Sequence, residues 1–234
     1  MANNTYSFTD LKKAVTHALA GNPDQNITTD EIVNGALSWL GSMAPWRWKQ
    51  KALNIAQVNA QTFVNLPADF EELMVLRKVG DTTGMVESVT LDRIIEARQA
   101  GGTVASGLWY CLDWTPQSGP TVEPTPILQL YPTPGATPPA LIGTYLRQIP
   151  KLVNATDLPD IPSAWHELLK IMCRAYAVSQ EGQSRGADWQ LMLDMLPRYE
   201  ALDGRSPGYL GKYRGGIRPA SASNLASQTQ TIGA

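Results

Sequence analysis

Apolar residues recur at helical spacing in the first forty residues and predict two helices. The first has Leu11, Val15 and Leu19 on one face. We expect Thr9 to cap its start and Gly21 to end it.

The second predicted helix begins with a capping box, because Thr28 is followed three residues later by Glu31. Its apolar face contains Ile32, Val33, Ala36, Leu37 and Leu40. Gly35 lies inside this helix and lowers its intrinsic stability, and Gly41 is the expected end.

From about Lys49 the helical spacing gives way to short segments rich in Val, Leu and aromatic residues, which are typical of strands. We predict strands around Phe63 and Leu66 and at residues 73–76, 85–89, 108–112, 127–131 and 141–146. A short helix capped by Thr90 is expected at Leu91–Ala100, ending at Gly101. No predicted helix is long enough for repeated βαβ crossovers, so an antiparallel sheet or a small sandwich is favoured.

Helical spacing returns after Pro150, behind a proline-stiffened loop at residues 157–162. The first helix there carries an apolar stripe of Trp165, Leu168, Leu169, Met172 and Tyr176. The last helix has Trp189, Met192, Leu193 and Leu196 on one face. We expect Pro197 to kink or end it, since proline removes a backbone hydrogen bond.

These patterns predict an α+β fold. Residues 1–46 and 151–204 are expected to supply the N- and C-terminal helices of one helical bundle. Residues 47–150 are expected to form a central, antiparallel β-rich domain, and residues 205–234 an extended basic tail.

Proline and the chemically reactive residues narrow the possible functions. Eleven of the 17 prolines lie between Pro116 and Pro162, where they stiffen the turns of the β-rich part. With two cysteines and two histidines, neither a disulfide scaffold nor a standard zinc ligand set is expected. The sequence also predicts no signal segment, membrane span or cofactor.

Charge is distributed unevenly along the chain. The net charge is -2, but residues 205–234 contain four cations and no acid, so the tail carries +4 and the rest -6. The tail has few aliphatic side chains and could not bury enough apolar surface to fold alone. It does contain two tyrosines, so we expect a partner to order it. The candidate partner-binding residues there are Tyr209, Lys212, Tyr213, Arg214 and Arg218.

A second candidate site is the run Trp46, Arg47, Trp48 and Lys49, in which two indoles alternate with two cations. Such a run can stack bases or sugars. It can equally form a hinge or interface with one indole buried, and we favour this second interpretation.

Catalytic interpretations find little support. Ser163 and His166 lie three residues apart, but no nucleophile elbow accompanies them, so a histidine on the helix surface is the simpler expectation. Asp157 and Asp160, and the acids Asp69, Glu71 and Glu72, could provide paired carboxylates. The glycine pairs at residues 101–102 and 215–216 lack the spacing of a phosphate-binding loop.

Two stretches carry a family resemblance. Upstream is NLPADFEEL at residues 65–73. Downstream, LQLYPTP at 128–134 is followed by GTYLRQIP at 143–150, NATDLPDIP at 154–162 and WHELL at 165–169. Together they resemble the head-to-tail adaptor proteins of short-tailed bacteriophages, the family that includes tail tubular protein A. In order of elements the resemblance covers about residues 5–205.

The resemblance implies a structural protein of the virion neck, made in the host cytoplasm, with no enzymatic activity. It implies a ring of twelve copies that docks between the portal protein and the tail nozzle or tail tube, with DNA passing through its lumen. It also implies that the C-terminal tail reaches the portal or a neighbouring subunit.

Two other functions remain open on the sequence alone. One is a tail-associated hydrolase that cleaves cell-wall glycans through paired carboxylates. The other is a monomeric module that stacks a glycan or nucleic acid on Trp46 and Trp48.

Overall fold

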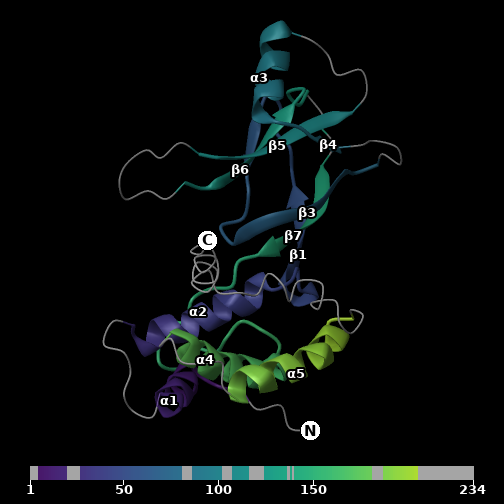
Figure 1. Cartoon of the computed structure of the whole chain (residues 1–234). Helices are drawn as coiled ribbons and strands as arrows, with labels where there is room; N and C mark the ends of the chain where they lie inside the picture. The colour runs from purple at the N-terminus through teal and green to yellow at the C-terminus, as the bar shows by residue number, and fades with distance from the viewer. Residues whose placement is uncertain are drawn as a thin grey trace, which may run out of the picture. The chain divides into compact units, whose positions relative to one another are not determined.

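The computed structural model describes residues 5–19, 27–80, 86–101, 107–115, 124–135, 138, 140–180 and 187–204. These residues form two compact units (Figure 1). The helical unit contains the chain up to Trp48 and again from Pro150, and the β unit is the continuous stretch Lys49–Ile149. The helical unit is therefore built from two segments, with the β unit inserted between them.

The described part of the helical unit contains the helices α1 (Phe8–Ala18), α2 (Thr29–Ser42), α4 (His166–Gln180) and α5 (Ala187–Leu202). Two short 3₁₀ helices, η1 (Arg47–Lys49) and η2 (Ser163–Trp165), lie at the segment boundaries. Helix α4 packs against α1, α2 and α5. The predicted stripe on α4 explains this central place, because Leu168, Leu169 and Met172 are completely buried.

The start of α1 differs from the sequence expectation. Ser7, not Thr9, is the N-cap: its hydroxyl accepts from the Asp10 N–H at 3.3 Å, and the Asp10 carboxylate accepts from the Ser7 N–H at 3.1 Å. Thr9 instead donates its hydroxyl to the Ala155 carbonyl at 2.8 Å. The helix ends at Ala18, and Gly21 lies outside the described residues.

Helix α2 has the predicted capping box, with reciprocal hydrogen bonds between Thr28 and Glu31. It ends at Ser42, one residue beyond Gly41. A Cβ atom at Gly35 would lie 2.8 Å from the ring of Tyr176, so the missing side chain allows α4 to approach. The glycine that weakens the isolated helix therefore serves its packing.

Hydrogen bonds tie the N-terminal helices to the loop after Pro150. The N–H groups of Phe8 and Thr9 donate to the carbonyls of Asp157 and Ala155 at 2.8 and 3.1 Å. The Asn34 side chain accepts from the Leu152 N–H at 2.8 Å and donates to the Leu152 carbonyl at 3.0 Å. These bonds join segments more than one hundred residues apart in the sequence.

Pro197 does not end the last helix, so the expectation of an end at this residue was wrong. Helix α5 continues from Ala187 to Leu202 with Pro197 inside it. Leu196, just before this proline, and Tyr199, two residues after it, are buried at 0% and 3% exposure. Tertiary packing of this apolar face outweighs the missing backbone hydrogen bond.

The β unit contains two sheets. One has three strands in the order β1 (Gln50–Ile55), β7 (Leu141–Arg147) and β3 (Phe70–Lys78), and both of its pairs are antiparallel. The other has four strands in the order β2 (Phe63–Asn65), β6 (Pro126–Tyr131), β5 (Leu108–Trp114) and β4 (Val86–Ser88). The fold is therefore α+β, as predicted.

The antiparallel prediction fails for one strand pair, because β4 pairs with β5 in parallel. The predicted short helix, α3 (Leu91–Ala100), connects these two strands. Its last residues are anchored on the sheet: Arg98 donates to the carbonyls of Thr62 and Leu130, both at 3.1 Å. The β unit therefore contains one short βαβ crossover, formed by β4, α3 and β5, although the sequence argued against repeated βαβ crossovers.

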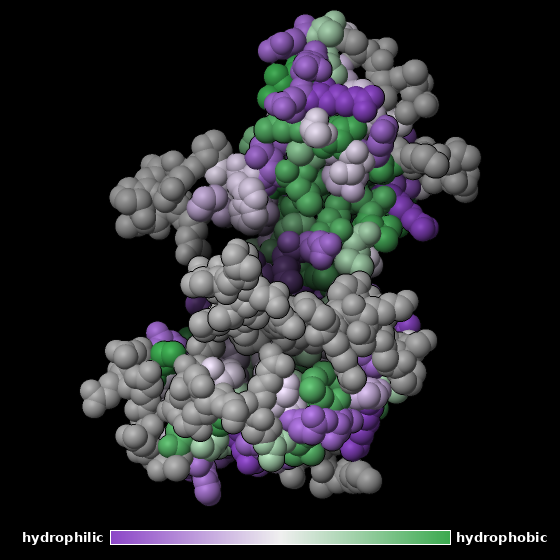
Figure 2. Space-filling model, in the orientation of Figure 1, coloured by the Kyte–Doolittle hydropathy of each residue, from purple (hydrophilic) through white to green (hydrophobic). Residues whose placement is uncertain are grey.

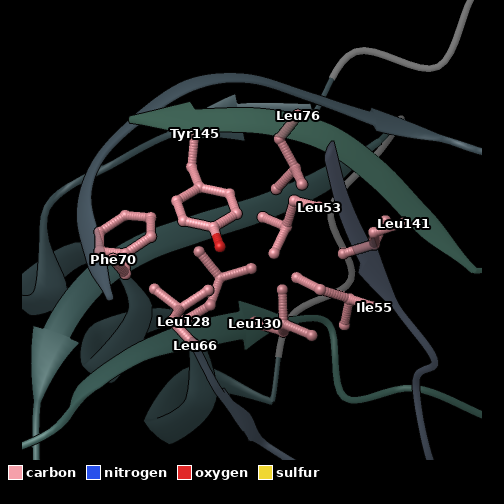
Figure 3. Close-up of a cluster of buried hydrophobic side chains, with 9 residues drawn as sticks. All are labelled: Leu53, Ile55, Leu66, Phe70, Leu76, Leu128, Leu130, Leu141 and Tyr145. Atoms are coloured by element: carbon pink, nitrogen blue, oxygen red, sulfur yellow. The ribbon is translucent and has the colours of Figure 1, made fainter. Parts of the chain in front are cut away.

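The core of the β unit lies between its two sheets (Figure 3). The three-stranded sheet contributes side chains from all its strands, and the four-stranded sheet contributes Leu128 and Leu130. Phe70 and Tyr145 stack at 5.7 Å between ring centroids. A Cβ atom at Gly143 would lie only 2.1 Å from the Val75 carbonyl oxygen, so this glycine permits the close approach of β7 and β3.

No helix within the described ranges combines the length and the apolar character needed to cross a membrane.

Candidate partner-binding site

Trp46 is a core residue of the helical unit. It has 0% exposure, and its indole N–H donates to the Leu40 carbonyl at 2.6 Å. Its ring meets Trp165 edge-on at 4.8 Å between centroids. Because no face of this indole is open, Trp46 cannot stack on a ligand, which contradicts its role in the proposed monomeric binding module.

Trp48 is half-buried and belongs to the same aromatic cluster. Its ring lies 5.8 Å from that of Trp165, which in turn lies 5.1 Å from Tyr199 of α5. The segment that joins the two units is therefore fixed on η2 and α5 by aromatic packing. Both indoles therefore pack within the helical unit, next to the point in the sequence at which the β unit begins.

Arg47, between the two tryptophans, is exposed and lies at the end of α5. Its backbone N–H donates to both carboxylate oxygens of Asp203, at 2.9 and 3.2 Å. A Cβ atom at Gly204 would lie 2.6 Å from Nη1 and 3.0 Å from Cζ of the Arg47 side chain. The guanidinium therefore lies directly against the backbone of Gly204, the residue just before the tail.

The structure brings Arg47 against two residues that are far away in the sequence, Asp203 and Gly204. Arg47 contacts the last described residues of the chain, and the tail candidates Tyr209, Lys212, Tyr213, Arg214 and Arg218 follow outside the described residues. Sequence reasoning missed Asp203 and Gly204. No local signal could have revealed them, because Arg47 and Asp203 are 156 positions apart.

The sequence matches the SU10 adaptor protein family over residues 6–214. The chain belongs to this family of phage head-tail adaptors. The matched range begins just before α1, extends through all the described helices and strands and ends at Arg214 in the tail. Among individually curated proteins, none matches the sequence significantly.

Family membership makes the adaptor a structural protein of the phage virion at the junction of head and tail. The family is one of structural virion components and is not a known enzyme family. The resemblance that the sequence motifs indicated is confirmed.

His166 of the adaptor does not have the geometry of a general base. It is buried at 3% exposure, which corrects the expectation of a surface histidine. Its Nδ1 accepts from the Tyr6 N–H at 3.0 Å, and a hydrogen bond joins it to the Ile161 backbone. Burial lowers the pKa of His166, so the neutral ring serves to hold the N-terminal segment.

The adaptor's second histidine, His17, lines a surface hollow of about 670 Å³ with Lys13 and Lys170. Lys170 lies 4.4 Å from the centroid of the Tyr6 ring, whose hydroxyl donates to Glu167 at 2.6 Å. These contacts fasten the N-terminal segment to α4. They offer no activated nucleophile next to His17.

The candidate carboxylates of the hydrolase hypothesis have structural partners. Asp157 accepts from the N–H groups of Val153 and Asn154 at 2.9 and 2.7 Å, and these bonds lower its pKa. Glu71 pairs with Lys49 at 2.6 Å. A glycosidase acid needs a raised pKa, so Asp157 does not fit that role.

Asp69 is held in the same manner. Partial burial favours a raised pKa, but hydrogen bonds from Lys51 at 2.6 Å and Tyr145 at 2.9 Å outweigh it and lower the pKa of Asp69. The same contact and the burial of the ring raise the pKa of Tyr145 to about 12. This carboxylate is thereby tied to strands β1 and β7.

Metal and thiol chemistry are likewise unsupported in the described part of the adaptor. No group of three or more His, Cys, Asp or Glu side chains there could hold a metal ion. Cys111 and Cys173 are free thiols, and burial raises the pKa of Cys173. A protonated, fully enclosed thiol is a packing residue.

Proposed function

We propose that this adaptor assembles into a ring of twelve copies between the portal protein and the tail nozzle or tail tube, with DNA passing through the lumen. The family match over residues 6–214 is the observation that carries the proposal. The tail, residues 205–234, docks on the portal or on a neighbouring subunit.

The charge of the chain supports passage of DNA. Outside the tail the chain carries -6, so its body does not attract phosphates by bulk charge. A lumen lined by many cations would bind the backbone and slow the movement of DNA. Positive charge is instead concentrated in the tail, whose proposed partner is a protein.

Exposed apolar side chains support subunit contacts through the β unit. Figure 2 shows hydrophobic residues gathered over the strands of this unit on the face in view. Among the described residues of the β unit, the large hydrophobic residues that are exposed are Val58, Phe63, Met74, Val75, Val79, Ile95, Leu112, Trp114 and Ile142. A ring repeats one heterologous interface until it closes, and apolar and aromatic anchors are enriched in such interfaces.

Electron microscopy of the purified protein, with and without the portal protein of the same phage, tests the ring. Closed rings in either sample are the expected result. Discrete monomers in both samples would contradict the proposal.

A pair of truncations tests the tail. Removing residues 205–234 should leave a body with an unchanged unfolding temperature that no longer docks on the portal. The matched control removes only residues 219–234, which contain no charge and no tyrosine. This shorter truncation should dock as the full chain does, and normal docking of the longer one would contradict the assignment.

A further inference from the structure

The outer face of the three-stranded sheet is an open apolar surface. Side chains of its three strands fill the core of the β unit, so their neighbours along each strand lie on the opposite face. The strand register arranges these neighbours in two adjacent rows, Ala52, Thr144 and Val75 in one and Asn54, Ile142 and Arg77 in the other. Val75 and Ile142 are each 44% exposed, so the middle of the face is open to a partner.

Arg77 is the one charged residue of these two rows. It is exposed, and it has no hydrogen-bond or ion-pair partner among the described residues. The next row contains Glu72 beside Leu146, which is only 3% exposed, so the open part of the face ends there. The open part is therefore apolar and positive, with one carboxylate at its margin.

Helix α3 has an outer side of the opposite charge. Its inner side is packed on the four-stranded sheet, where Ile94 is 0% exposed. The outer side carries Asp92, Ile95 and Glu96, which share one side of a helix because they are three and four positions apart. Ile95 is 41% exposed, and both carboxylates are exposed.

The basic residues of α3 do not neutralise these carboxylates. Arg93 lies 4.6 Å from the centroid of the Trp109 ring, and Arg98 donates to backbone carbonyls of the sheet. Asp92 and Glu96 have no hydrogen-bond or ion-pair partner among the described residues. The outer side of α3 therefore presents one apolar side chain between two free negative charges.

The two surfaces lie on opposite sides of the β unit. Leu130 of the four-stranded sheet faces the core, and Tyr131 next to it faces away and donates its hydroxyl to the Ala97 carbonyl of α3 at 3.0 Å. The order of layers is thus three-stranded sheet, four-stranded sheet and α3 (Figure 1). Because both sheets separate α3 from the open face, the helix of one chain cannot cover the face of that chain.

We propose that α3 of one copy packs on the outer face of the three-stranded sheet of the next copy. The inference rests on the proposed ring and adds the two surfaces that meet in it. The apolar face of a sheet is normally covered by a helix or a second sheet, and α3 supplies that helix. The surfaces differ, so the contact is heterologous and can be repeated from copy to copy.

Charge complementarity fixes the partner as a second copy of this chain. Ile95 of one copy covers Val75 and Ile142 of the next. Arg77 then lies beside the carboxylates of Asp92 and Glu96, and each free charge gains a partner of opposite sign.

Disulfide cross-linking of full-length variants with portal protein of the same phage tests the contact. All chains carry Cys111→Ser, which leaves only the buried Cys173. After mild oxidation, a mixture of Val75→Cys chains and Ile95→Cys chains should give cross-linked dimers, and neither variant alone should. In the matched control, Leu112→Cys replaces Val75→Cys at a site of similar exposure, 43%, and should give no cross-link.

A charge exchange tests the same contact without cysteines. Arg77→Glu and Glu96→Arg each place like charges together and should raise the protein concentration needed for assembly about 3- to 10-fold. The double variant restores opposite charges and should recover most of the loss, which simple destabilisation would not do. Sedimentation velocity measures assembly, unfolding temperatures report on the fold, and Lys151→Glu, at an exposed cation of the helical unit, should assemble as wild type.

The outcomes separate this inference from the proposed function. Closed rings in which the Val75→Cys and Ile95→Cys chains do not cross-link would overturn the inference alone. Cross-linking of Val75→Cys chains with one another would also overturn it, because the face would then pack against itself. Open filaments with the expected cross-link would support the contact and contradict the proposed ring.

Discussion

The two units of this adaptor are stabilised in different ways. The helical unit joins two distant segments through an aromatic cluster around Trp165 and through hydrogen bonds such as that from Phe8 to Asp157. The β unit is one continuous segment whose core is mainly aliphatic and depends on the close approach of its strands. Contacts between two distant segments therefore hold the helical unit together, whereas the β unit is built within one segment of the chain.

The units also differ in the apolar surface they leave uncovered. Nine large hydrophobic residues are exposed on the described part of the β unit, and four on that of the helical unit, namely Val153, Leu158, Leu191 and Leu202. In the helical unit, aromatic side chains such as Trp46 and Trp165 are buried in the core of the unit itself. The contrast indicates that the β unit is the better candidate for contacts between copies.

The largest effect is expected from Trp165→Ala. It removes the ring shared by Trp46, Trp48 and Tyr199 and should lower the free energy of unfolding of the helical unit by about 4 kcal/mol. Hydrogen exchange followed by mass spectrometry resolves the two units and should show faster exchange in α4 and α5. Equal acceleration in the β unit would show that the units do not differ as described.

The converse experiment destabilises the β unit instead of the helical unit. Gly143→Ala should destabilise this unit by about 3 kcal/mol, because the new methyl group collides with the Val75 carbonyl. The control, Gly135→Ala, adds a methyl group with no atom within 4 Å and should change little. Exchange in the helical unit should be unaffected by either substitution, and similar destabilisation by both would refute the packing argument.

Acidification should affect the helical unit selectively between pH 7 and 5. Burial lowers the pKa of His166 in the folded protein, so below about pH 6.5 the unfolded chain binds the additional proton and stability falls. The slope is at most about 1.4 kcal/mol per pH unit for one proton. The β unit contains no histidine and should not respond in this range.

Denaturant unfolding of variants at pH 7.5 and 5.5 checks the assignment. His166→Gln should abolish the pH difference, whereas His17→Gln, a substitution on the exposed face of α1, should retain it. If the stability of His166→Gln still differs between the two pH values, a group other than His166 is responsible for the pH dependence.

The smallest effects concern helix caps. Ser7→Ala removes a hydrogen-bonded cap in the helical unit and should cost about 1 kcal/mol. Thr90 occupies the same position before α3 but makes no side-chain cap hydrogen bond, so Thr90→Ala should change stability by less than about 0.5 kcal/mol. Urea unfolding curves measure both, and equal effects would contradict the difference between the caps.

Local patterns predicted most elements of both units. The Thr28–Glu31 capping box and the left-handed Gly101 after α3 were correct because each depends on neighbouring residues only. Strand β1 (Gln50–Ile55) was missed, since its alternation is weak and its place is set by pairing with β7. The parallel pairing of β4 with β5 is likewise decided by tertiary contacts.

In the candidate site, too, neighbouring residues reveal some features and tertiary contacts determine the others. Charge and composition were enough to name Arg47 and the tail as two separate candidates for partner binding. The contact of Arg47 with Asp203 and Gly204 depends on how α5 ends beside η1, which no local pattern encodes. For the same reason Trp46 could not be recognised as fully buried, or His166 as a core residue, before the packing was known.

The pairing of Gln50 with Leu146 has a consequence for how such a protein can vary. The first and last strands of the β unit are neighbours in one sheet, so the two ends of this unit lie next to each other. An inserted segment with adjacent ends can be exchanged for another of different size without altering the framework that carries it. A change in the length of the β unit can therefore leave in place the hydrogen bonds that join the two segments of the helical unit.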